Sequence, residues 1–92
     1  MVQLSETPLV SDQGELLFAR YSTEPRMLED VLEALAAAPF PINPHIHHAR
    51  TTVVEFPLYS SQLDRLERTL RSHAIPLDGL TAKPMLEELR RA

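Results

Sequence analysis

The 92 residues of this chain alternate between two kinds of apolar periodicity, and the order of these segments limits the folds open to it. Apolar residues recur at every second position in a strand, and at intervals of three and four in a helix. The pattern predicts a hairpin with a first strand at 9–21, a helix at 24–38, a second hairpin at 42–58, a helix at 61–73 and a short helix at 84–91. Strand, helix, strand, strand, helix is the order of a split βαβ unit with its continuation.

Connection rules turn this order into one architecture. A right-handed crossover puts both long helices on one face and sets the later central strand beside the first. We therefore predict a single α+β domain over residues 1–92. Its fold class is a ferredoxin-like two-layer sandwich: an antiparallel sheet of four or five strands, two helices on one face and a short C-terminal helix. Either Ile75–Ala82 or the N-terminal arm at Leu9-Val10 is expected to fill the free edge of the first strand, and the turn residues Asp12 and Gly14 favour the arm.

Alternation also assigns the two faces of the sheet. The face predicted to be buried carries Ile42, Ile46, Val54, Phe56 and Leu58. Helical spacing gives the first helix an inward stripe of Leu28, Val31, Leu32 and Leu35. We expect Leu32 and Phe56 to be deeply buried. The open face is expected to carry Leu17, Ala19, Tyr21 and Val53. Because an exposed apolar patch usually marks a partner surface, this assignment predicts a homodimer through the open sheet face.

Composition excludes several classes of function. The formal net charge is −4, which disfavours nucleic-acid binding because phosphates need a positive field. The chain has no cysteine, so disulfides, thiolate metal sites and thiol catalysis are excluded. Residues Met1–Glu6 lack the features of a signal peptide, and no apolar run approaches the ~18 residues of a membrane span. We expect a cytoplasmic protein with no membrane partner.

Histidines are concentrated in one short segment. In a strand, His45 and His47 point to the same face, so two imidazoles are suited to chelate one divalent transition-metal ion. The predicted fold also brings the tip of the second hairpin and the end of the second helix to one end of the domain, so His48 and His73 are expected to be neighbours. The candidate metal ligands are therefore His45, His47, His48 and His73.

A ligand site without metal is the other interpretation of this segment. Glu55 is expected across from His45 in the hairpin. Asn43 belongs to a proline-rich connector, which is interpreted first as a stiff link that protects a sheet edge and alternatively as a rigid wall beside a ligand groove. The candidate ligand-binding residues are His45, His47, Glu55 and Asn43. No phosphate loop, nucleophile elbow or zinc-protease helix motif is present in the sequence, so no catalytic residue and no resident cofactor is predicted.

The opening of the first helix resembles that of ACT-type regulatory modules. Pro25-Arg26-Met27-Leu28 is similar to their Pro-Gly-x-Leu opening, and Ile42-Asn43 stands where their helix leads into the second strand. The resemblance covers Glu15 to about Leu80 and implies a small dimerising module. Arg26 replaces the glycine that approaches the amino-acid effector, so effector binding does not carry over.

Three functions follow from these observations. The first is a non-enzymatic, homo-oligomeric, ACT-like module that binds a small ligand or a protein partner. The second is a metal-binding or metal-sensing protein that uses the histidine segment. The third is a small dimeric α+β-barrel enzyme.

Overall fold

A computed structural model describes residues 10–11 and 14–91, which form five strands, three α-helices and short 3-10 turns. The strands are β1 (Val10–Ser11), β2 (Gly14–Thr23), β3 (His45–His48), β4 (Thr52–Tyr59) and β5 (Leu80–Pro84). The helices are α1 (Leu28–Ala36), α2 (Leu63–Ser72) and α3 (Met85–Arg91). The 3-10 turns Pro25–Met27 and Ser60–Gln62 lead into α1 and α2.

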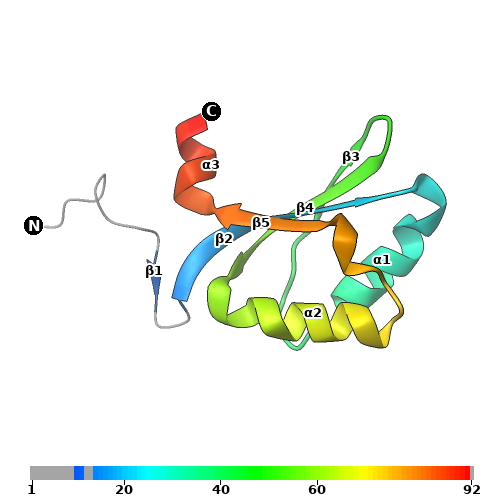
Figure 1. Cartoon of the computed structure of the whole chain (residues 1–92), viewed down its shortest axis with the longest axis horizontal. Coiled ribbons are helices and arrows are strands. Elements are labelled where there is room, and N and C mark those ends of the chain that lie inside the picture. Colours follow the sequence, from blue (N-terminus) through cyan, green and yellow to red (C-terminus); the bar gives the residue numbers. More distant parts are fainter. Residues whose placement is uncertain (1–9, 12–13, 92) are drawn as a thin grey trace, which may run out of the picture.

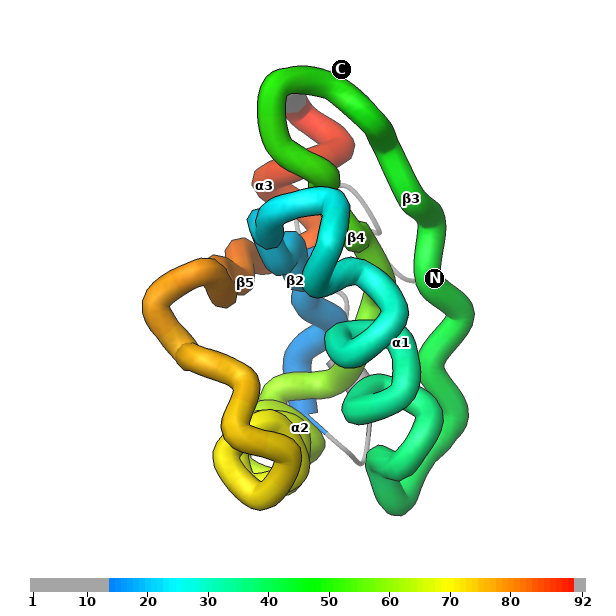
Figure 2. The backbone as a smooth tube through the Cα atoms, turned by 90° about the vertical axis from the view of Figure 1, so that its right-hand side faces the viewer, coloured from blue at the N-terminus to red at the C-terminus, as the bar shows by residue number. Residues whose placement is uncertain are grey.

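The four main strands lie in the antiparallel order β5-β2-β4-β3. Helices α1 and α2 lie together on one side of this sheet, whereas α3 stands on the other side (Figure 1). This confirms the predicted α+β sandwich with a ferredoxin-like arrangement and a short C-terminal helix. Seen from the side, β3 runs along the edge of the sheet (Figure 2).

Parts of both candidate segments pair with β2, namely Leu80–Ala82 of the first and Val10 of the second, which corrects the expectation that only one would fill this edge. Strand β5 pairs with Leu17–Tyr21, and β1 pairs with Gly14 and Glu15. They use different residues of β2, so neither excludes the other. The N-terminal arm favoured by turn chemistry contributes two residue pairs, and β5 contributes five. Leu9 lies outside the described residues.

The core lies between the sheet and α1 with α2. Its sheet residues are Leu17, Ala19, Tyr21, Val54, Phe56 and Leu58, all buried. The register sets Ala19 opposite Phe56, and opposed residues share a face. The expectation that Leu17, Ala19 and Tyr21 occupy the open face was therefore wrong. Leu16 and Phe18 are apolar too, so alternation in β2 does not distinguish its faces.

Two further burial expectations need correction. Leu32 is only partly buried and packs against the core, whereas the buried residues of α1 are Val31, Ala34 and Leu35. Ile46 does share the face of Val54, but it is 38% exposed because β3 is the edge strand. Phe56 is fully buried, as predicted.

Pro57 lies within β4, near its end at Tyr59. Strand β3 covers only Thr52–Glu55, so on that side β4 needs no donor at Pro57. The Ser60 hydroxyl accepts a hydrogen bond from the Glu15 amide at 3.0 Å. Among the described helices, none is long and apolar enough to cross a membrane.

Candidate functional site

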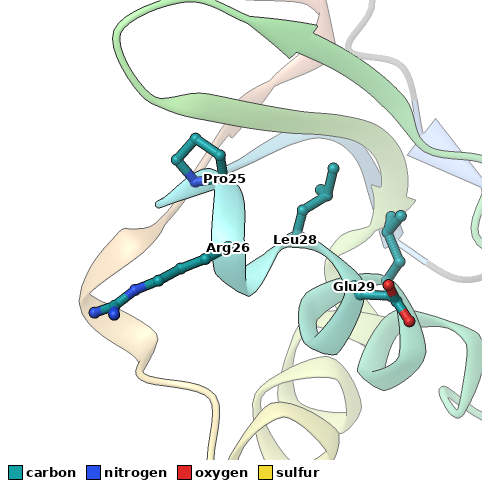
Figure 3. Close-up of a pocket in the computed structure, with 5 residues that line it drawn as sticks. Pro25, Arg26, Leu28 and Glu29 are labelled. Carbon is teal, nitrogen blue, oxygen red and sulfur yellow. The ribbon is translucent and has the colours of Figure 1, made fainter.

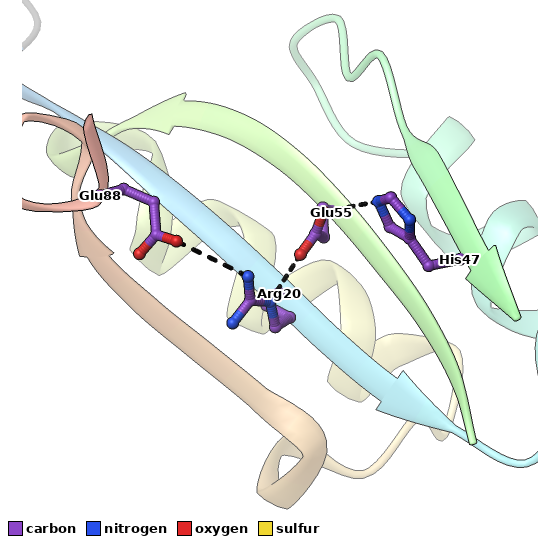
Figure 4. A network of polar contacts seen from close by, with 4 residues as sticks. All are labelled: Arg20, His47, Glu55 and Glu88. Carbon is purple, nitrogen blue, oxygen red and sulfur yellow. Dashed lines mark hydrogen bonds and ion pairs between the residues drawn. The ribbon is translucent and has the colours of Figure 1, made fainter. Parts of the chain in front are cut away.

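A polar network crosses the open face of the sheet (Figure 4). Glu55 on β4 lies at its centre: one carboxylate oxygen is 2.7 Å from Arg20 Nε, and the other is 2.7 Å from His47 Nε2. A carboxylate oxygen of Glu88 on α3 lies 3.7 Å from Nη2 of the same guanidinium. Three neighbouring strands and the C-terminal helix thus each contribute one side chain.

Strand register explains how these side chains meet. Arg20 lies directly opposite Glu55 in the β2–β4 pair, and opposite charges at such positions stabilise a sheet. On the other side of β4, His45 is the residue directly opposite Glu55, and His47 is the diagonal neighbour. The imidazole of His47 reaches the carboxylate along this diagonal, which is within the range of long side chains.

The network is graded from covered to open. The side chain of Glu55 is 16% exposed, that of Arg20 is 39% exposed and that of His47 is 61% exposed. The Arg20 guanidinium also lies 5.6 Å from the centre of the Phe18 ring, within range of a cation–π contact. The Glu55 carboxylate is therefore held between Arg20 and His47. Of these three side chains, His47 is the one most exposed to solvent.

Among the described residues, one atom beside this network is left without a partner. The second carboxylate oxygen of Glu88 is buried and accepts no hydrogen bond. Its side chain as a whole keeps some exposure, at 22%. Helix α3, which carries Glu88, packs against β2 and covers that part of the open face.

The sequence-predicted site residues are only partly brought together. Glu55 does lie across from His45, as predicted, but its contact is with His47. Asn43 is exposed in the connection before β3. His48 lies 3.4 Å from the Thr52 hydroxyl on the opposite face, and His73 lies 3.0 Å from the Thr69 carbonyl oxygen at the end of α2.

The four candidate metal ligands do not form one cluster. The hairpin tip between β3 and β4 and the end of α2 lie at opposite sides of the molecule in both views, so His48 and His73 are not neighbours (Figures 1 and 2). Across residues 14–90, no group of three or more His, Asp or Glu side chains could hold a metal ion within one chain. The metal site itself stays a prediction.

Two surface hollows lie away from the network. One, of about 490 Å³, follows the start of α1 and is lined by Pro25, Arg26, Leu28, Glu29 and Leu32 (Figure 3). Part of the ACT-like sequence motif therefore lines a hollow. Arg26 is turned toward Glu24, with 2.7 Å between Nε and the carboxylate.

The second hollow, of about 300 Å³, lies between the end of β2 and the loop before β5. Tyr21 is in its wall, and the tyrosine hydroxyl donates a hydrogen bond to the Pro76 carbonyl. Burial raises the pKa of Tyr21, and the nearby Asp78 carboxylate raises it further. The folded chain therefore holds the phenol proton to a higher pH than an unfolded chain does.

Sequence reasoning missed Arg20 and Glu88. Arg20 stands in a strand whose apolar residues gave no clear face, and Glu88 belongs to a short helix far along the chain. The correct register of β2 against β4 would have revealed that Arg20 lies opposite Glu55.

No family model matches this chain, and no curated protein matches it. The function is therefore argued from the geometry and chemistry of the residues.

Proposed function

We propose that the chain is a non-enzymatic, homodimeric, ACT-like module that binds a small ligand or a protein partner beside the network of Arg20, Glu55 and His47. The observation that carries this proposal is the fixing of Glu55, whose two carboxylate oxygens are each held at 2.7 Å, one by Arg20 and one by His47. Polar groups held on strands of a rigid sheet are positioned more accurately than groups on loops. Such a preformed surface suits recognition.

The exposure of the network favours binding over catalysis. His47 is 61% exposed, whereas a catalytic base is normally enclosed with its substrate so that water is excluded. Neither of the two hollows described above is lined by His47, Glu55 or Arg20. The cytoplasmic location expected from the sequence belongs to the same proposal.

We place the dimer contact at the edge of the sheet. Helix α3 covers part of the open face, and Leu17, Ala19 and Tyr21 belong to the core, so the apolar patch expected there is smaller. All four residues of β3 are exposed, and His45–His48 contain neither the proline nor the lysine that often protects an edge. A second copy of β3 fits this edge, because antiparallel pairing about a two-fold axis makes the strand its own partner.

The second candidate function is a dimeric α+β-barrel enzyme. The contact between His47 and Glu55 favours it, because a histidine oriented by a carboxylate is the arrangement of a general base. In such a dimer the two open sheet faces lie against each other. The two candidates therefore differ in the surface that holds the copies together.

Light scattering on the untagged chain with a chelator, at high micromolar concentration, tests the proposal. Two exposed large apolar residues in the described part of the chain provide matched variants: Ile46 on β3 is 38% exposed and Leu89 on α3 is 60% exposed. We expect a dimer for the wild type and for Leu89→Lys, and a monomer for Ile46→Lys. A monomeric wild type would overturn the dimer. A monomeric Leu89→Lys beside a dimeric Ile46→Lys would favour contact through the face.

A further inference from the structure

Strand β3 carries two histidines whose environments differ. The register sets His45 opposite Glu55 and His47 opposite Val53, and both histidines lie on the open face. His47 Nε2 lies 2.7 Å from one oxygen of the Glu55 carboxylate. His45 is exposed on the same side of an edge strand. In the part of the chain that the structure describes, no group of three or more His, Asp or Glu side chains could hold a metal ion, so these two histidines do not form a complete site within one chain.

A second copy of the strand changes this. Two residues that face each other across an antiparallel pair lie on the same face of the sheet, so a symmetric pairing of β3 must be centred on a residue. Centred on Ile46, the pairing sets His45 of one copy opposite His47 of the other. The two-fold axis repeats this juxtaposition, so each dimer has two such pairs.

The spacing of such a pair suits one metal ion. Residues directly opposite in an antiparallel pair have Cβ atoms about 4.5–5.5 Å apart. Two imidazoles at this separation are able to direct a nitrogen each at one ion, since metal–nitrogen bonds are about 2.0–2.1 Å long. Imidazole ligands suit zinc, nickel and copper and do not suit calcium or magnesium.

Glu55 gives one of the two histidines a defined role. A neutral His47 that donates its Nε2 proton to the carboxylate keeps its lone pair on Nδ1, the atom that is then available to a metal. Metal-binding histidines usually donate their other ring proton to a carboxylate in this way, which fixes the ring and raises its basicity. Arg20 holds the second oxygen of Glu55 and so keeps the carboxylate in place.

We propose that two copies of the chain, paired antiparallel along β3, bind divalent transition-metal ions between His45 of one copy and His47 of the other. This inference rests on the dimer contact of the proposed function and adds its ligand class. Each dimer holds two equivalent ions, so the stoichiometry is one ion per chain. His48 faces the opposite side of the sheet, and His73 lies at the end of α2, so neither takes part.

Calorimetric titration of the untagged chain with Ni²⁺, and separately with Zn²⁺, tests this site. We expect one ion per wild-type chain, and no binding over the same concentration range to His45→Ala or to His47→Ala. His73→Ala is the matched control and should bind like the wild type. All three side chains are exposed, so each variant should keep the wild-type melting temperature within a few degrees, which circular dichroism checks.

Mixing the two defective variants is the decisive step. A mixed dimer holds one intact site, formed by the His45 that the His47→Ala copy keeps and the His47 that the His45→Ala copy keeps. We expect the equimolar mixture, incubated to exchange copies, to regain binding that neither variant has alone. Wild-type binding without this recovery would overturn the inference, because both ligands would then belong to one chain.

Failure of the metal site and failure of the dimer are distinguishable. A chain that dimerises in chelator and binds neither metal overturns this inference and leaves the proposed function standing. A chain that is monomeric with and without metal overturns both. Metal-dependent tightening of the dimer, lost in His45→Ala and His47→Ala alike, is the result expected.

Discussion

At the scale of single residues, Tyr21 links the core to the loop before β5. Its side chain is buried at 4% exposure, and its hydroxyl donates a hydrogen bond to the Pro76 carbonyl. Burial raises its pKa above the value of 10.0 expected for an unfolded chain, and Asp78 adds to the rise. The unfolded chain therefore releases this proton first as the pH increases, and folding stability falls from about pH 10 upward.

We predict that Tyr21→Phe separates the stability that the Tyr21 hydrogen bond provides from the stability that is lost when Tyr21 ionises. At about pH 7 the variant should lose about 0.5–1.5 kcal/mol, the net value of a typical hydrogen bond. Above about pH 10 only the wild type has the additional loss from Tyr21 ionisation, so the difference between the two proteins should narrow. Urea unfolding at a series of pH values measures this, with Tyr59→Phe as the control. A difference that stays constant through pH 11 would contradict the assignment.

Phe56 and Leu32 test the packing of the core. Phe56 is fully buried between the sheet and the helices, whereas Leu32 lies at the edge of the core and is partly buried. Truncation of Phe56 to Ala should cost about 3–5 kcal/mol of unfolding free energy, because it removes buried area and leaves a cavity. Leu32→Ala should cost less than about 2 kcal/mol, since solvent already reaches that site. Equal costs in denaturant unfolding would show that the helix stripe is placed wrongly.

At the scale of elements, the order of strands and helices could be predicted from the sequence. Which face of β2 is buried could not. In β4 the buried and open positions alternate clearly, so Val54, Phe56 and Leu58 were placed correctly. In β2 the run Leu16 to Ala19 is apolar on both sides, and only pairing with β4 shows which side is covered. The network was partly foreseen for the same reason: Glu55 opposite His45 follows from β3 and β4, whereas Arg20 required β2.

Gly14 marks the start of β2 and has a backbone that few other residues adopt. Its φ is +101°, and a Cβ added there would lie 2.2 Å from Ser60 Oγ. The Ser60 hydroxyl accepts a hydrogen bond from the Glu15 amide and so joins β2 to the turn before α2. The start of the strand and the start of the helix are therefore coupled through one glycine.

We predict that Gly14→Ala destabilises the chain by about 1–2 kcal/mol or more, from backbone strain and the contact with Ser60. Ser60→Ala alone should cost about 0.5–1.5 kcal/mol for its hydrogen bond. The double variant should cost less than the sum, because removal of Oγ relieves the contact. Thermal or urea unfolding of the four proteins completes the cycle, and strictly additive costs would argue against this contact.

At the scale of the whole molecule, the sheet is covered on one face by α1 and α2 and on part of the other by α3. The edge formed by β3 stays exposed along all four of its residues. A chain of this size buries a modest fraction of its surface, so pairing with a second copy adds stability that depends on concentration. In the proposed dimer, this edge would bring His47 and the Glu55 carboxylate close to the second copy, which would link assembly to recognition.

Oxidation of Ile46→Cys tests the paired edge most directly. The chain has no cysteine of its own, and pairing centred on residue 46 sets the two introduced thiols opposite each other. Opposed residues in antiparallel strands have Cα atoms about 4.5–5.5 Å apart, which suits a disulfide. We predict that mild oxidant converts Ile46→Cys to a covalent dimer far faster than Leu89→Cys, as followed by non-reducing electrophoresis. Equal rates for the two variants, or faster crosslinking at position 89, would contradict the account.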